Sequence, residues 1–123
     1  MSLLIEEIAD ELEDQSVGVV GTSIFVTRLP PSPADAIAVS DNGGAPTATT
    51  GIKNRKVQVL VRNDSYSDGA AKAAAVMTAM QNNWLTLDTW TVYSRADAQP
   101  LYLGVEENGL HTWSLNFTIT GKT

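Results

Sequence analysis

Alternation of apolar and polar residues marks the centre of the chain as a strand. Within residues 56–62, every second position from Val57 to Val61 is valine, and Gln58 and Arg62 fall on the other side. Successive side chains of a strand point to opposite faces, so this repeat predicts a strand with one face on a hydrophobic core.

The cleanest alternation lies near the end of the chain, in residues 111–120. It predicts a strand with one apolar face and one face rich in hydroxyl groups. The apolar face carries Trp113, Leu115, Phe117 and Ile119, and the outward face carries Thr112, Ser114, Asn116, Thr118 and Thr120.

Two other segments have the periodicity of helices. Within residues 2–15 apolar residues recur three and four positions apart, and acidic residues cover the remaining surface. Residues 66–81 are rich in alanine and contain no proline, and Ser65 precedes them as a capping side chain. The first apolar stripe consists of Leu4, Ile5, Ile8 and Leu12, and the second of Tyr66, Ala70, Ala73, Met77 and Met80. We expect two helices that pack through these stripes.

Shorter apolar runs predict the remaining strands. Residues 24–28 and 35–40 flank a proline-rich turn, and we expect them to pair as antiparallel neighbours. Residues 88–94 and 101–106 follow the second helix, and the turn at 107–109 joins the latter to the final strand. The pattern therefore predicts one α+β domain that spans residues 1–123.

Residues 41–55 form the longest stretch without apolar periodicity. They are polar, small and glycine-bearing. We expect a long flexible loop there, which is either the tip of a hairpin or an arm that orders against a neighbouring molecule.

Charge is distributed unevenly along the chain. The formal net charge is -6, and six of the fourteen acidic residues lie on the first predicted helix, so the remaining eight balance the eight basic residues. These six are Glu6, Glu7, Asp10, Glu11, Glu13 and Asp14. They are either solvated or compensated by a basic partner. Outside this helix the chain is neutral, which argues against specific nucleic-acid binding.

Catalytic and metal-binding patterns are weak. The chain has no cysteine, and His111 is its one histidine, so neither a zinc site nor a serine triad is indicated. The carboxylates gather on a helix face expected to meet water, where no apolar pocket would raise their pKa. We therefore expect no enzyme activity, no cofactor and no metal. No segment has the length or pattern of a membrane span or signal peptide, and we expect a protein made in the cytosol.

One basic cluster is evident in the sequence, at the start of the central strand. It consists of Lys53, Arg55 and Lys56. These residues are either a solvated strand end or a surface that meets the acidic helix of a neighbouring copy. The second alternative is a head-to-tail contact, and contacts of that kind form rings when they close.

Four stretches resemble the minor capsid and tail terminator (tail completion) proteins of long-tailed phages. They read LLIEEIADELE (residues 3–13), GTSIFVTRLPPSPADAIAV (21–39, followed by Gly43-Gly44-Ala45-Pro46), VQVLVR (57–62, before the alanine-rich helix) and GVEENGLHTWSLNF (104–117). Their order and spacing carry the resemblance.

This resemblance implies a curved, mixed and mostly antiparallel sheet of about five to six strands with two helices packed on one face. It also implies a virion protein assembled in the host cytoplasm as a ring, typically a hexamer. Such a ring ends polymerisation of the tail tube at the junction of tail and head, and its partners are the tail-tube protein and the head connector. The family supplies no catalytic residues.

Two alternatives remain beside this interpretation. The chain is also compatible with a tail-tube or head-tail connector (neck) subunit, which would polymerise into tubes or bind the portal ring. A small binding or enzymatic domain unrelated to phages would instead need a concave pocket with convergent polar groups.

Overall fold

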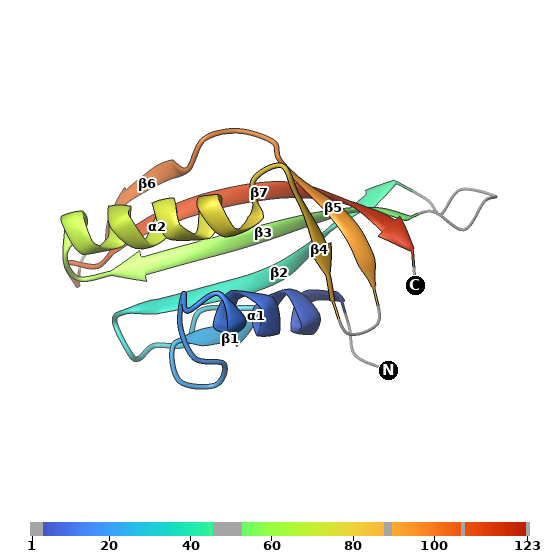
Figure 1. The fold of residues 1–123 in the computed structure, drawn as a ribbon. Coiled ribbons are helices and arrows are strands. Elements are labelled where there is room, and N and C mark those ends of the chain that lie inside the picture. The colour runs from blue at the N-terminus through green and yellow to red at the C-terminus, as the bar shows by residue number, and fades with distance from the viewer. Residues whose placement is uncertain (1–3, 46–52, 88–89, 107, 123) are drawn as a thin grey trace.

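The computed structural model describes residues 4–45, 53–87, 90–106 and 108–122, and shows two helices and seven strands in these ranges (Figure 1). In chain order the elements are α1 (Leu4–Asp14), β1 (Ile24–Val26), β2 (Ala36–Ala45), β3 (Lys53–Asn63), α2 (Tyr66–Met80), β4 (Asn83–Thr86), β5 (Thr91–Ala96), β6 (Leu101–Val105) and β7 (His111–Lys122). Ser2, at the expected start of the first helix, lies outside the described residues.

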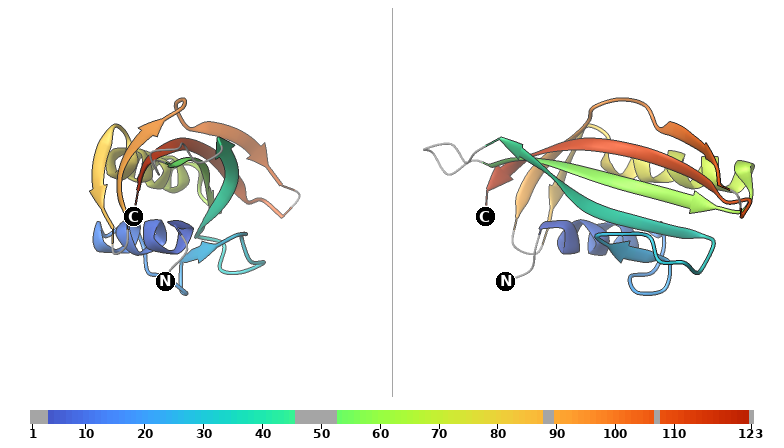
Figure 2. Two further views of the ribbon diagram at one scale, coloured as in Figure 1. Left: turned by 90° about the vertical axis from the view of Figure 1, so that its right-hand side faces the viewer. Right: turned by 180° about the vertical axis from the view of Figure 1, so that it is seen from behind.

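The strands form one sheet in the order β1-β2-β3-β7-β5-β4, and β6 pairs with β7 beside this path. One edge of β7 pairs with β3 along its length, and the other pairs with β6 near His111 and with β5 near Lys122. The sheet curls around both helices, which lie on the same face (Figure 2). The predicted α+β class, the curved and mostly antiparallel sheet and the two helices on one face are confirmed, and β4 is the strand that the sequence did not predict.

The alternating segments build the core as predicted. Val57, Val59 and Val61 of β3 are buried, and so are the four apolar residues of β7 from Trp113 to Ile119. Both helices contribute to the same core cluster.

Helix α2 lies close to the sheet. Ser65 caps it, because its Oγ accepts a hydrogen bond from the N–H of Asp68. A Cβ at Gly69 would lie 2.2 Å from the Trp113 ring, so only glycine allows this approach. The buried face therefore centres on Gly69, Ala73 and Val76, while Tyr66 at the end of the predicted stripe is 54% exposed.

The predicted antiparallel pairing of the first two strands is wrong, because β1 and β2 are parallel, with Ile24 opposite Ile37. The reason lies in the proline-rich connection, which leaves β1 at Thr27 with a positive φ of 77° and returns to the start of β2. The connection is held by Arg62, whose guanidinium donates hydrogen bonds to the carbonyls of Pro30 and Pro33 at 2.5 and 2.7 Å.

The predicted loop at 41–55 is shorter in the structure. β2 continues through Ala45 and β3 begins at Lys53, so Gly44 pairs with Arg55 and Ala45 with Asn54. Backbone pairing needs no apolar side chains, which is why the hydrophobic pattern did not show it. We call residues 41–45 and 53–55 the β2–β3 arm, and residues 46–52 lie outside the described part of the chain.

Candidate assembly surfaces

Helix α1 presents most of its acidic residues at the surface. Asp10, Glu13 and Asp14 are exposed, and the helix has no basic residue in its last turn. They line a hollow of about 350 Å³ between α1 and the end of β4, with Thr86 and Leu87 on the other side. The hollow therefore collects negative charge on one side of the molecule.

Two of the predicted acidic residues do not simply face water. Glu7 is 2% exposed, which corrects the prediction that it lies on the solvated face. It follows the buried stripe of the helix, next to Leu4 and Ile8. Glu13 accepts a hydrogen bond from the N–H of Val20 at 2.8 Å, so it fixes the turn after the helix.

The structure does not bring the three predicted basic residues into one cluster. Arg55 forms an ion pair with Asp41 across the β2–β3 arm. Lys56 is the next residue of the strand, so its side chain points to the opposite face. Lys53 begins β3 opposite Gly121, and its side chain lies outside the described part of the structure.

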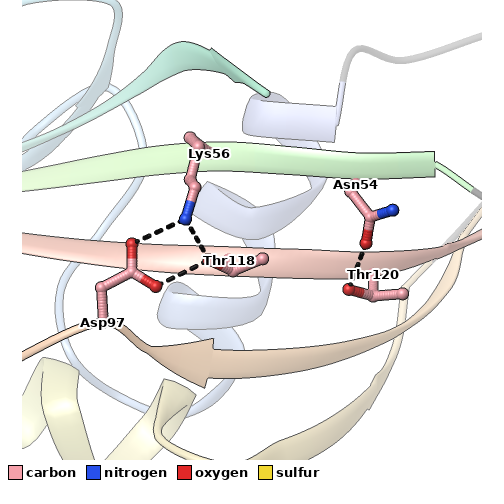
Figure 3. A network of polar contacts seen from close by, with 5 residues as sticks. All are labelled: Asn54, Lys56, Asp97, Thr118 and Thr120. Atoms are coloured by element: carbon pink, nitrogen blue, oxygen red, sulfur yellow. Dashed lines mark hydrogen bonds and ion pairs between the residues drawn. The ribbon is translucent and has the colours of Figure 1, made fainter. Parts of the chain in front are cut away.

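Lys56 belongs to a polar network on the outer face of β3 and β7 (Figure 3). Its Nζ donates to Thr118 Oγ1 at 2.7 Å and to Asp97 Oδ2 at 3.2 Å, and Thr118 Oγ1 donates to Asp97 Oδ1 at 2.6 Å. Beside it, Thr120 Oγ1 donates to Asn54 Oδ1 at 2.8 Å.

The hydroxyl-rich row of β7 is thus largely bound within the subunit. Thr112 and Ser114 are buried, and Ser114 accepts a hydrogen bond from the Gln58 side chain at 3.0 Å. Asn116, which is half-buried, also donates to Ser114. Only part of the row predicted to face outward is free to contact another molecule.

His111 lies in an aromatic cluster. Its Nδ1 is 2.7 Å from the hydroxyl oxygen of Tyr102, and the rings of Tyr66, Tyr102 and Trp113 surround it at centroid distances between 5.7 and 6.2 Å. These contacts attach β6 to the start of α2. In the described ranges, no group of three or more His, Cys, Asp or Glu residues is placed to hold a metal ion.

Exposed large hydrophobic residues gather at two edges of the sheet. Those in the described residues are Val19, Val20, Val26, Tyr66, Trp84, Leu101, Tyr102, Leu103 and Val105. Three of these nine lie at or beside β1 and five at or beside β6, while Trp84 is alone on β4. The β6 group was not predicted from the sequence, although the run Leu-Tyr-Leu-Gly-Val has no polar residue in alternation.

These edges, the arm and the acidic hollow are surfaces of the kind that a structural subunit uses in an assembly. The chain belongs to the bacteriophage tail terminator family: the family described as "Bacteriophage tail terminator protein" matches residues 11–123. The resemblance inferred from the sequence is therefore confirmed.

Among solved structures, the chain is similar to one from the structure titled "Virion of native gene transfer agent (GTA) particle". The TM-score is 0.73 at 17% sequence identity, over 98% of this chain and 95% of the other. At this identity the likeness establishes a shared fold. No curated protein sequence matches the chain. Neither helix in the described residues is long and apolar enough to cross a membrane.

Proposed function

We propose that this protein is a non-enzymatic virion subunit that forms a ring on the head-proximal end of a phage tail tube. The observation that carries the proposal is the family match over residues 11–123. The shared fold with a chain of a gene transfer agent virion supports it. On this proposal the ring is a hexamer, ends tube polymerisation and joins the tail to the head connector. It is assembled in the host cytoplasm and resides at the tail-head junction.

The arrangement of surfaces is consistent with a ring subunit. Ser114, Thr118 and Thr120 on the outer face of β7 make hydrogen bonds within the subunit, so less of that face is available to another molecule. The sheet edges and the β2–β3 arm remain for neighbouring copies. The acidic hollow of α1 has a charge that would suit a partner with positive charge.

The direct test adds the purified protein to tail-tube protein from the same phage while tubes are growing. We expect tubes of reduced length that carry a ring at one end in negative-stain images. A matched reaction should contain the protein after heat denaturation. Tubes of unchanged length without an end ring would contradict the proposal.

The same images separate the other phage roles. A tail-tube subunit would form tubes by itself, and a neck connector would bind the portal ring while leaving tube length unchanged. Either result would replace the terminator role with that role.

A further inference from the structure

The two groups of exposed apolar residues lie at the same level of the sheet. The strand pairing shows this. Ile24 of β1 is opposite Ile37 of β2, which is opposite Val61 of β3. Val61 is in turn opposite Trp113 of β7, which is opposite Tyr102 of β6. β1 and β6 are therefore the outermost of five strands at this level, and in Figure 1 β6 lies above α2 while β1 lies below α1. We call Val19, Val20 and Val26 the β1 edge, and Leu101, Leu103 and Val105 the β6 edge.

The two edges differ in shape. The β1 edge is hollowed: a depression of about 370 Å³ is lined mainly by apolar residues, among them Val20, Ile24 and Pro31. The three residues of the β6 edge are between 54% and 60% exposed. Leu101 is opposite Ser114 and Val105 is opposite His111, so these two side chains lie on the two faces of the sheet, on either side of β6.

The β1 edge offers side chains and little free backbone. The N–H of Ile24 donates to the carbonyl of Val19, and the carbonyl of Ile24 accepts from the N–H of Gly21. The turn before β1 thus occupies both backbone groups of Ile24, and the carbonyl of Val26 accepts from the Thr27 hydroxyl, so few backbone groups of β1 are left for another strand. A partner at this edge is held by apolar packing in the depression and not by extension of the sheet.

We propose that the β6 edge of one copy packs into the depression at the β1 edge of a second copy. The inference rests on the proposed ring. Both surfaces are carried by the same chain, residues 101–105 have no charge, and Arg28 is the one charged residue that lines the depression. Apolar patches of this kind lose unfavourable contact with water when they meet.

The occupant is a second copy because the chain itself carries both apolar edges, on the two outermost strands of this row of five, and a ring subunit presents two different surfaces to its two neighbours. A contact between the β6 edge of one copy and the β1 edge of the next is head-to-tail. Each added copy leaves one edge of each kind free, and such head-to-tail contacts end only when the chain of copies closes into a ring.

A cysteine cross-link tests the contact directly, because the chain contains no cysteine of its own. Val26→Cys and Leu103→Cys are made as separate proteins, mixed at high concentration, mildly oxidised and separated on a non-reducing gel. We expect a disulfide-linked heterodimer at least about tenfold more abundant than with Trp84→Cys in place of Val26→Cys, because contact raises the effective concentration of the two thiols. Trp84 is a matched control, since it is an exposed apolar residue on another edge strand, β4.

A substitution supplies the second measurement. Leu103→Asp should raise the dissociation constant of self-association by about tenfold or more, whereas Trp84→Asp should change it less than about twofold. Light scattering over a concentration series measures both, and circular dichroism checks that each variant is folded. Both sites are exposed, so folding should be retained.

The outcomes separate the contact from the tail role. Cross-linking no stronger than the control, or homodimers from Val26→Cys alone, would overturn the β6–β1 contact even if rings still cap tail tubes. Cross-linking in a protein that never binds tail tubes would support the contact and reject the terminator role.

Discussion

Asp97 joins two elements of the polar face at the scale of a single side chain. Burial raises the pKa of its carboxyl group, but hydrogen bonds from Thr118 and Lys56, with the positive charges of Lys56 and Arg95, outweigh this effect. The pKa of Asp97 therefore lies below its usual value of 3.8. The ionised form is bound more strongly in the folded protein than in the unfolded chain.

The low pKa of Asp97 predicts a pH-dependent contribution to stability. The contribution is complete above the unfolded pKa and is lost as the pH falls through the folded pKa. We expect Asp97→Asn to lower the free energy of unfolding near pH 7 by less than about 1 kcal/mol, because this pair is largely exposed. The difference from the unmodified protein should shrink as the pH falls below 3.8 and through the lower pKa of the folded state.

Urea unfolding at a series of pH values measures this difference. Glu106→Gln is the control, because Glu106 is an exposed acid outside the network. A loss of stability that stays the same at low pH would show that the Asn side chain disturbs the strand and that the ionised carboxylate is not the cause.

At the scale of elements, Arg62 decides how the first two strands pair. Arg62 is 6% exposed, and its guanidinium donates to the carbonyls of Pro30, Pro33 and Ala34. These contacts attach the connection between β1 and β2 to β3. Without them three carbonyls lose a charged donor.

Removal of these donors should loosen the connection. We expect Arg62→Met, which keeps the length of the side chain, to lower the free energy of unfolding by about 2–4 kcal/mol. Arg28→Met alters an exposed arginine of the same connection and should change it by less than about 0.5 kcal/mol. Chemical denaturation compares the two variants, and equal losses would reject the role of Arg62.

Sequence patterns predicted the elements whose residues meet the core directly. The period-two spacing of the valines from Val57 to Val61, and of the apolar residues of β7, predicted which side chains are buried. The capping serine and the alanines predicted α2. The parallel pairing of β1 depends on contacts of Arg62 with a connection distant in the chain, which no local pattern records. β4 is four residues long and gives too little alternation to be recognised.

The candidate sites were predictable in part. The acidic residues of α1 were found, although Glu7 is buried. The basic cluster was predicted because its residues are close in sequence, but neighbouring side chains of a strand point to opposite faces. Arg55 pairs with Asp41 and Lys56 pairs with Asp97, and both partners are distant in sequence. The β6 edge was missed because residues 101–105 were interpreted only as a strand.

For the molecule as a whole, the negative charge is concentrated on α1, and the rest of the chain is neutral. We propose that these acids meet the arm of a neighbouring copy, through Lys53 and Arg55. Arg55 is paired with Asp41 within the subunit, so this contact would exchange that ion pair for one with α1, whereas Lys56 is paired with Asp97 on the other face of the sheet. This charged contact is separate from the β6–β1 contact and is tested separately.

Charge reversal tests that contact. Arg55→Glu should weaken self-association severalfold at low salt, and the effect should shrink at about 1 M salt, where charges are screened within about 3 Å. Lys56→Glu is the matched control on the opposite face. Adding Asp10→Lys and Asp14→Lys to Arg55→Glu should restore association, since the charges are then exchanged. Unchanged mass in light scattering for Arg55→Glu would contradict the contact.

The position of β7 has a consequence for synthesis on the ribosome. β3, β5 and β6 all pair with this strand, so none of them has its central neighbour until residues 111–122 have emerged. The nascent chain therefore exposes most of its core strands during translation and folds late. Such non-local pairing is slow and prone to aggregation, so the time spent between synthesis and folding is the stage at which chaperones would matter most.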